Sequence, residues 1–430
     1  MENNKAIFAI EDSKGFKIKM LNWSRRFNIF CFLDSGSGGG DGSAFDYLLA
    51  AGCKRSVSIT HDNGLEALQV FADHNKDWLF GHLGYDVFNN KAAKPGSFEN
   101  DVDFGDGFFF IPEILLHLKD NILTIVSEHK DTIEIFNAIN EQESCIKNSG
   151  PVNIEFEYGV SRDDYKAIIQ DLKDHILRGD CYEINFCQHF FASGVSIDPV
   201  FYYYLLSEIS PNPHGAFYKL HDKYCLCASP ERFLKKSGNT IFSQPIKGTS
   251  KRDLTDAAAD LKSKQHLMNS EKEKSENVMI VDLVRNDLSK ICTEGSVHVK
   301  ELFGLYSFPQ VHQMISTIGG TVDPAISLIE IIKACFPMGS MTGAPKIKVM
   351  ELIAKYEHFS RGLFSGSIGY ITPGGDFDFN VVIRSLFIDE TKKIISFKAG
   401  GGITFNSDAE QEYEECMLKA EAIINILKNG

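Results

Sequence analysis

The sequence predicts a large mixed α/β fold of the α+β kind, and three observations support this prediction. Short runs with the alternation of β-strands are interspersed with longer segments whose apolar residues recur at helical spacing. Strands and helices do not alternate regularly, as they would in a doubly wound parallel sheet. The chain has 430 residues, 43% of them hydrophobic, which is enough to bury an extensive core.

Two regions differ in how much chemistry they carry. Residues 1–155 are predicted to form an N-terminal β-rich region that packs on the core, and residues 156–430 are predicted to form a second region that carries the candidate functional motifs. Within the first region, the glycine-rich stretch 35–43 is predicted to be a flexible surface loop, because no Gly-Lys-Ser/Thr sequence follows it. Asn148-Ser149-Gly150-Pro151 is a plausible junction between the two regions.

Regular elements follow from Ser161 onward. Ser161 to Asp164 has the pattern of a helix N-terminus, apolar residues continue at helical spacing to Leu177, and Gly179 ends this helix. Further helices are predicted over residues 261–288, 325–335, 345–356 and 408–427. Strands are predicted over residues 182–191, 215–220, 224–228, 232–236, 240–244, 365–372, 379–389 and 394–399.

Composition excludes several classes of function. A net charge of −14 argues against a nucleic-acid partner. No apolar run approaches the roughly 18 residues of a membrane span. The ten cysteines lack metal-ligand spacing, and the first residues lack the pattern of a secretory signal, so a reduced, cytoplasmic protein is expected.

Lys247 is the most informative residue of the chain. It lies sixteen positions after Glu231, and the runs 232–236 and 240–244 between them predict a β-hairpin with a turn at Ser237-Gly238-Asn239. Such a hairpin would place Glu231 and Lys247 at the same open end, within reach of each other. An acid and an amine brought together in this way can perform covalent chemistry, although on this segment alone a surface lysine beside a turn is the simpler interpretation.

Two predicted helices carry matched carboxylates. Glu273 and Glu276 lie three residues apart on one helix, and Glu412 and Glu415 repeat this spacing on another, with Lys419 one turn further on. Either pair alone could be a solvated helix face. However, Glu276 and Glu415 both lead into apolar runs, and carboxylates that enter a core need a partner. Two inner carboxylates with two outer ones behind them suit Mg²⁺.

Glycine-rich segments and one arginine complete the candidate site. Residues 338–346 form a loop that opens a helix, where backbone N–H groups could receive an anion or simply begin the helix. Gly400, Gly401 and Gly402 end a strand just before the acidic helix, so a ligand could approach the backbone closely. Arg384 ends an apolar strand, and either a structural ion pair or recognition of a carboxylate would explain it.

These segments together resemble the chorismate-utilising enzymes. The resemblance covers residues 155–430 strongly and the first part weakly. It rests on an ordered series of motifs: Asp180-Cys-Tyr-Glu-Ile-Asn-Phe186, Ser229-Pro-Glu-Arg-Phe233, Pro245-Ile-Lys-Gly-Thr249, the run from Glu276 to Asp287, Gly339-Ser-Met-Thr-Gly-Ala-Pro-Lys346, Gly366-Ser-Ile-Gly-Tyr370, Val382-Ile-Arg384 and Ala399-Gly-Gly-Gly402.

The resemblance implies a fold and favours one activity. The fold would be a two-sheet β-sandwich core with outer helices and the active site between the sheets. Within the family, aminodeoxychorismate synthases usually carry Lys at position 247, whereas anthranilate synthases usually carry Ala. Gln313 stands where anthranilate synthases place a His associated with loss of pyruvate, and Glu183 stands near the position of a Lys base in isochorismate synthases.

The resemblance also implies roles for the candidate residues. Glu231 would protonate the departing C4 hydroxyl of chorismate, and Lys247 would attack C2 to give a covalent intermediate. Ammonia would come from a glutamine amidotransferase partner, since the chain lacks a Gly-x-Cys-x-Gly nucleophile elbow. Mg²⁺ would be held by Glu276 and Glu415 with Glu273 and Glu412 behind them, and the substrate by Arg384, Lys419, Gly400, Gly401, Gly402, Ser340 and Thr249.

One physical requirement and two alternatives accompany this hypothesis. A lysine with an ordinary pKa near 10.4 is almost fully protonated at neutral pH, so burial or the metal must lower the pKa of Lys247. The first alternative is anthranilate synthase component I. The second is a non-catalytic sensor that binds chorismate or tryptophan.

Overall fold

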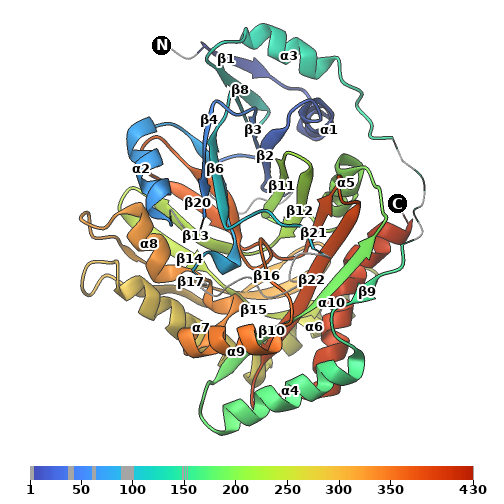
Figure 1. Ribbon diagram of the computed structural model, residues 1–430, viewed down its shortest axis with the longest axis vertical. Coiled ribbons are helices and arrows are strands. Elements are labelled where there is room, and N and C mark those ends of the chain that lie inside the picture. The colour runs from blue at the N-terminus through green and yellow to red at the C-terminus, as the bar shows by residue number, and fades with distance from the viewer. Residues whose placement is uncertain are drawn as a thin grey trace.

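The computed structural model describes residues 4–36, 43–60, 64–88, 101–147, 150, 152 and 154–429. The predicted loop at 35–43 and the predicted junction at 148–151 lie largely outside the described residues. Two large antiparallel sheets form the centre of the molecule, and helices cover them on the outside (Figure 1). None of the helices in the described part of the chain is long and apolar enough to cross a membrane.

The first sheet has twelve strands and runs through both predicted regions. From one edge to the other its strands are β1 (Asn4–Ala9), β8 (Ile122–Ser127), β7 (Ile114–Lys119), β3 (Tyr47–Ala51), β2 (Ile29–Asp34), β11 (His214–Leu220), β12 (Lys223–Ser229), β21 (Ser385–Asp389), β22 (Ile394–Ile403), β10 (Glu183–Ser193) and β18 (Gly343–Ala344), with β9 (Glu157–Tyr158) also paired to β10.

The second sheet has ten strands and is likewise shared. Its strands in order are β15 (Ile246–Lys251), β17 (Val311–Thr321), β14 (Thr240–Gln244), β13 (Arg232–Ser237), β20 (Phe377–Asn380), β19 (Ser367–Ile371), β5 (Leu79–Leu83), β6 (Gly107–Ile111) and β4 (Arg55–Ile59), with β16 (His298–Ser307) paired to β17. Both sheets therefore take strands from before and after residue 155.

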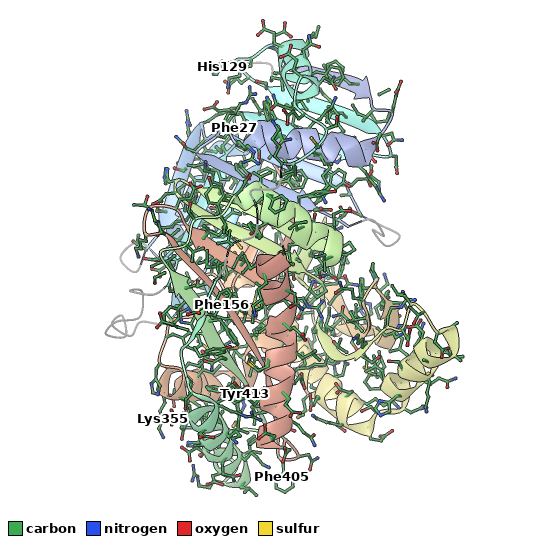
Figure 2. The ribbon with its side chains drawn as sticks, turned by 90° about the vertical axis from the view of Figure 1, so that its right-hand side faces the viewer. Phe27, His129, Phe156, Lys355, Phe405 and Tyr413 are labelled. Atoms are coloured by element: carbon green, nitrogen blue, oxygen red, sulfur yellow. The ribbon has the colours of Figure 1, made fainter. Side chains whose placement is uncertain are left out.

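Ten α-helices are present in the described chain. They are α1 (Ser13–Ser24), α2 (Glu66–Asn75), α3 (Thr132–Asn140), α4 (Arg162–Leu177), α5 (Pro199–Ile209), α6 (Ala257–Asn269), α7 (Glu271–Ser289), α8 (Leu328–Cys335), α9 (Lys346–Tyr356) and α10 (Ala409–Asn429). Figure 2 shows α10 running along the outside of the first sheet, with Tyr413 on the helix and Phe405 just before it.

Alternation along the strands explains how the two sheets acquire two cores. In β2, Phe30 and Phe32 face a core that includes residues of α1, α4, α5 and α10, whereas Cys31 and Leu33 face a core that includes both sheets, α7 and α8. All six residues of β2 are buried. A strand that is covered on both faces reads as a continuous apolar run, because neither face can be polar.

Most predicted elements are confirmed, and the N-terminus of α4 illustrates why. Ser161 has an extended backbone and accepts a hydrogen bond from the Asp164 N–H, and Gly179 follows the helix with a φ of +80°. The hairpin is also confirmed: β13 pairs with β14, with Ser237 opposite Thr240 and Arg232 opposite Gln244.

Two predicted elements are wrong. The single helix over 261–288 is two helices, because Ser270 breaks it with an extended backbone and caps α7 by accepting from the Glu273 N–H. The single strand over 379–389 is also two strands: β20 lies in the second sheet and β21 in the first. Between them Arg384 has a φ of +51°, which turns the chain from one sheet to the other.

Candidate active site

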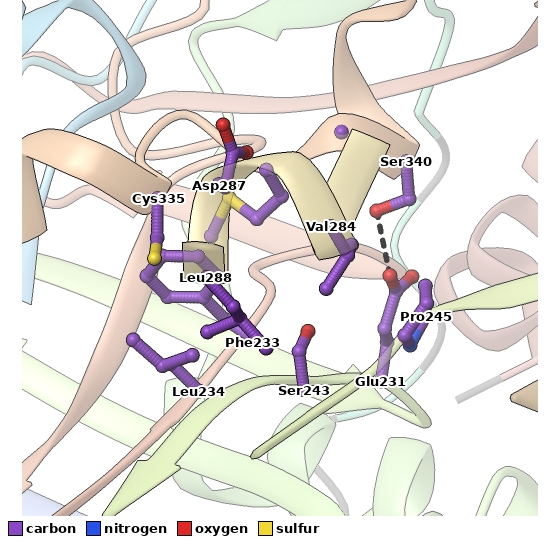
Figure 3. A pocket seen from close by; sticks show the side chains of 12 residues that line it. Glu231, Phe233, Leu234, Ser243, Pro245, Val284, Asp287, Leu288, Cys335 and Ser340 are labelled. Atoms are coloured by element: carbon purple, nitrogen blue, oxygen red, sulfur yellow. Dashed lines mark hydrogen bonds between the residues drawn. The ribbon is translucent and has the colours of Figure 1, made fainter. Parts of the chain in front are cut away.

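Glu231 lies where the hairpin opens, immediately before β13. Its carboxylate is buried and accepts a hydrogen bond of 2.6 Å from the hydroxyl of Ser340 (Figure 3). Burial raises the pKa of Glu231 to about 7, although the Ser340 hydrogen bond and Lys247 oppose the shift. A carboxyl group with this pKa can be protonated at neutral pH, as a general acid requires.

A pocket with a largely apolar lining lies beside Glu231. It contains about 350 Å³ of space, part of it open to solvent. Figure 3 shows Pro245 and Val284 near Glu231, with the Ser340 hydroxyl above the Glu231 carboxylate. The remaining lining residues are Phe233, Leu234, Ser243, Asp287, Leu288, Cys335, Met338 and Gly339. A largely apolar wall disfavours the charged form of a carboxyl group.

Lys247, in β15, also lies at the open end of the hairpin, as the sequence predicts. Its ammonium donates a hydrogen bond to Glu183, the first residue of β10, and both side chains are almost fully buried. Burial by itself lowers the pKa of Lys247, but the carboxylates of Glu183, Glu276 and Glu231 together raise it above its ordinary value. The shift therefore opposes the one that the nucleophile hypothesis requires.

Glu183 lies in this candidate site, although the sequence analysis did not select it. Its second carboxylate oxygen is buried without a hydrogen-bond partner among the described residues. A Cβ placed at Gly402 would lie 2.5 Å from both the Glu183 carboxylate and the Lys247 ammonium, so any larger residue there would displace these two groups. The sequence contained a signal in the motif around Glu183, but its pairing with Lys247 depends on contact between the two sheets.

The four predicted metal ligands converge from two helices. Glu273 and Glu276 lie on α7, and Glu412 and Glu415 lie on α10. The ammonium of Lys272 lies between them, 3.9 Å from a Glu276 oxygen and 3.7 Å from a Glu412 oxygen. Burial lowers the pKa of Lys272, but all four carboxylates raise it, and the net shift is upward.

These carboxylates fit a cation by their chemistry. One Glu276 oxygen is buried and receives no hydrogen bond within the described chain, and burial raises the pKa of Glu276 to about 7. Burial also raises the pKa of Glu273, whereas Lys419 lowers that of Glu415. In the present arrangement of the described residues, no three such side chains lie close enough together to hold a metal ion. Lys272 would have to move away for them to close around one.

The glycine strand lies directly against this acidic cluster. Lys419 donates to the Gly400 carbonyl at 2.8 Å and pairs with Glu415 at 2.7 Å. A Cβ placed at Gly401 would lie 3.3 Å from Glu412 and 3.8 Å from Glu415. The structure therefore brings Gly400, Gly401, Lys419 and both α10 carboxylates together, as the sequence predicts for one site.

The other two predicted substrate-binding residues lie around Glu231 and Lys247. Burial lowers the pKa of Arg384, and the charge of the Glu231 carboxylate partly counteracts this shift. Thr249 lies in β15 opposite Gln313 of β17. Gln313 is buried, and its amide oxygen has no partner within the described chain.

Comparison with known proteins identifies the class of this site. Residues 31–425 match the family model of the chorismate binding enzymes. The chain belongs to this family, and the sequence-based prediction that it is an enzyme of chorismate is confirmed.

Curated relatives fall into two groups. The aminodeoxychorismate synthase component 1 of Salmonella typhimurium is 34% identical over 390 residues, which cover 87% of this chain and 85% of the relative. The chloroplastic aminodeoxychorismate synthase of Arabidopsis thaliana is 40% identical over 290 residues, covering 67% of this chain and 31% of the relative. The anthranilate synthase component 1 of Saccharolobus solfataricus is 31% identical over 351 residues, which cover 81% of this chain and 80% of the relative.

Solved structures share the fold. The menaquinone-specific isochorismate synthase from Escherichia coli superposes with a TM-score of 0.78 at 17% identity, covering 99% of this chain and 94% of that one. Anthranilate synthase component I from Streptococcus pneumoniae superposes with a TM-score of 0.71 at 21% identity, covering 98% of this chain and 92% of that one. The predicted two-sheet core with outer helices is therefore confirmed.

Proposed function

We propose that this chain aminates chorismate at C4 to give 4-amino-4-deoxychorismate, a precursor of 4-aminobenzoate and folate. The observation that carries the proposal is the placement of Lys247 and Glu231 at the same open end of the hairpin, where a buried amine lies near a buried acid whose pKa is raised to about 7. Relatives named aminodeoxychorismate synthase, which include that of Salmonella typhimurium, support the same activity.

The proposed chemistry has two displacements. Lys247 Nζ forms a bond to ring C2, both ring double bonds shift, and the C4–O bond breaks while Glu231 gives its proton to the departing hydroxyl, which leaves as water. Ammonia then forms a bond to C4, the double bonds shift back, and the C2–N bond to Lys247 breaks. The one proton that the Lys247 ammonium must lose before it attacks can pass to Glu183, whose carboxylate accepts a hydrogen bond from Nζ.

We further propose that the enzyme depends on Mg²⁺. Glu276 and Glu415 would hold the ion, with Glu273 and Glu412 behind them through water, and the bound ion would supply Lewis acidity toward a substrate carboxylate and offset the negative charge that raises the pKa of Lys247. Arg384 and Lys419 would bind carboxylates of the substrate, and the backbone from Gly400 to Gly402, with Ser340 and Thr249, would complete the binding surface.

The ammonia would be supplied by a glutamine amidotransferase partner. The name component 1, which the Salmonella typhimurium relative carries, implies a second component for that protein. The sequence of this chain lacks a nucleophile elbow with a catalytic cysteine. Burial raises the pKa of nine of its ten cysteines, which suits packing rather than catalysis.

The product distinguishes this proposal from its main alternative. Purified protein is mixed with chorismate, Mg²⁺ and an ammonium salt, and the small molecules are identified by mass spectrometry. Replacement of the hydroxyl by an amine with retention of the pyruvyl group supports the proposal, whereas anthranilate with free pyruvate refutes it. The 31% identity to an anthranilate synthase component 1 is the reason for testing that outcome.

The role of Lys247 is tested separately by intact-protein mass spectrometry. Trapping during turnover is expected to show a mass increase on the wild-type chain and none on Lys247→Ala. Lys251→Ala, at the exposed end of the same strand, is the matched control and should form the adduct. An adduct that persists in Lys247→Ala would remove Lys247 from the nucleophile role.

A further inference from the structure

A buried ion pair between Glu357 and Arg361 lies next to the candidate active site. Both side chains are 1% exposed, and Arg361 donates to Glu357 from Nη2 at 2.6 Å and from Nε at 2.8 Å. The pair lies beyond α9, which ends at Tyr356, so it does not serve to stabilise a helix. The guanidinium also lies 4.6 Å from the centre of the Tyr85 ring, which comes from the N-terminal region.

This ion pair forms hydrogen bonds with the backbone of β10 in an interval that neither β18 nor β9 covers. Strand β18 pairs with β10 only at Glu183 and Ile184, and β9 pairs with it only at Phe190 and Phe191. In the interval between them, the Asn185 carbonyl accepts from Arg361 at 2.8 Å and the Cys187 N–H donates to Glu357 at 3.0 Å. Buried backbone groups need such partners, and here an arginine and a glutamate provide them.

Arg361 connects this strand edge to the loop that holds the general acid. Its Nη1 donates to the carbonyl of Met341 at 2.6 Å. Met341 directly follows Ser340, whose hydroxyl donates to Glu231. Asn185, the other carbonyl partner, lies two residues after Glu183, whose carboxylate accepts from Lys247.

We propose that Arg361, oriented by Glu357, is a positioning residue that fixes Ser340 and Glu183 relative to each other and so aligns Glu231 with Lys247. The inference rests on the proposed function only for the roles of those last two residues. A buried ion pair contributes little net stability, because desolvating both charges offsets their attraction. The guanidinium of Arg361, however, has five N–H donors in a rigid planar arrangement, and these donors fix the geometry of the segments that they join.

The test compares Arg361→Lys and Arg361→Met with the wild-type enzyme. Lysine keeps the charge but cannot reach the two carbonyls and both carboxylate oxygens at once. For Arg361→Lys we expect kcat for chorismate consumption to fall about 10- to 100-fold, as small misplacements of catalytic groups do, with little change in KM. We also expect the pH at which activity falls to move upward, since the Ser340 hydrogen bond that lowers the pKa of Glu231 would weaken.

The control is Lys17→Met, which breaks another buried ion pair, with Asp34 at 2.7 Å, on α1. Rates are expressed per folded molecule, from the urea unfolding curve of each variant. If Arg361→Met does not fold, Arg361→Lys alone decides. The inference is overturned if Arg361→Lys keeps the wild-type kcat and pH profile per folded molecule, or loses no more than Lys17→Met. Because chorismate consumption is followed whatever the product, a product other than 4-amino-4-deoxychorismate would refute the proposed function without affecting this test.

Discussion

Lys272→Met is expected to strengthen binding of a divalent cation. The Lys272 ammonium lies 3.9 Å from Glu276 and 3.7 Å from Glu412, two of the four carboxylates proposed to hold Mg²⁺. A cation that enters this cluster must displace the ammonium or tolerate its repulsion. Removing that positive charge therefore favours the metal-bound state.

The size of the effect follows from these distances. Two unit charges about 4 Å apart interact by about 1 kcal/mol in water. The Lys272 side chain is 46% exposed, so solvent and salt screen both contacts. The two contacts together then amount to about 1–2 kcal/mol, which corresponds to a dissociation constant about 5- to 30-fold lower.

The assay is a titration with Mn²⁺, a probe that carboxylates bind as they bind Mg²⁺, followed by electron paramagnetic resonance of the free ion. Lys274→Met is the matched control, because it removes the same charge from the same helix but from a pair with the exposed Glu271. Raising the ionic strength should reduce the difference between the two variants. If Lys272→Met binds Mn²⁺ no more tightly than Lys274→Met, the four carboxylates do not form the cation site.

Three further outcomes are expected. Chorismate consumption should fall as pH rises through about 7, because Glu231 must be protonated to act as an acid; a rate independent of pH between 6 and 8 would exclude that role. Gly402→Ala should abolish turnover while the protein remains folded, since the new Cβ would displace Lys247 and Glu183. The control Gly374→Ala should be fully active, because its Cβ would meet no atom closer than 3.8 Å. Stability to urea should decrease as pH falls from about 6.5 towards 4. Burial lowers the pKa of His82 to about 4 and that of His189 to about 3, so in this pH range mainly the unfolded chain binds protons at these two residues. His189→Gln should make the stability depend less on pH.

The sequence determined those features that depend on neighbours along the chain. The hairpin between Glu231 and Lys247 is an example: its alternating strands and its glycine-containing turn are local, so both its existence and its open end were predictable. The start of α4 at Ser161 was predictable for the same reason, since a cap and its helix lie within four residues. Grouping the carboxylates in pairs likewise needed only the helical repeat.

Only the tertiary structure decided which of these features meet. Glu183 and Lys247 are 64 residues apart, and they pair because β10 of one sheet and β15 of the other approach each other, which no local pattern encodes. The break at Ser270 is different, because it was a local signal that the prediction of one helix overlooked: Ser270 and Glu273 have the spacing of a helix N-terminus. Arg361 shows the limit most clearly: on the sequence it is one more charge near a helix end, and its role follows from two backbone carbonyls that folding brings within reach of one guanidinium.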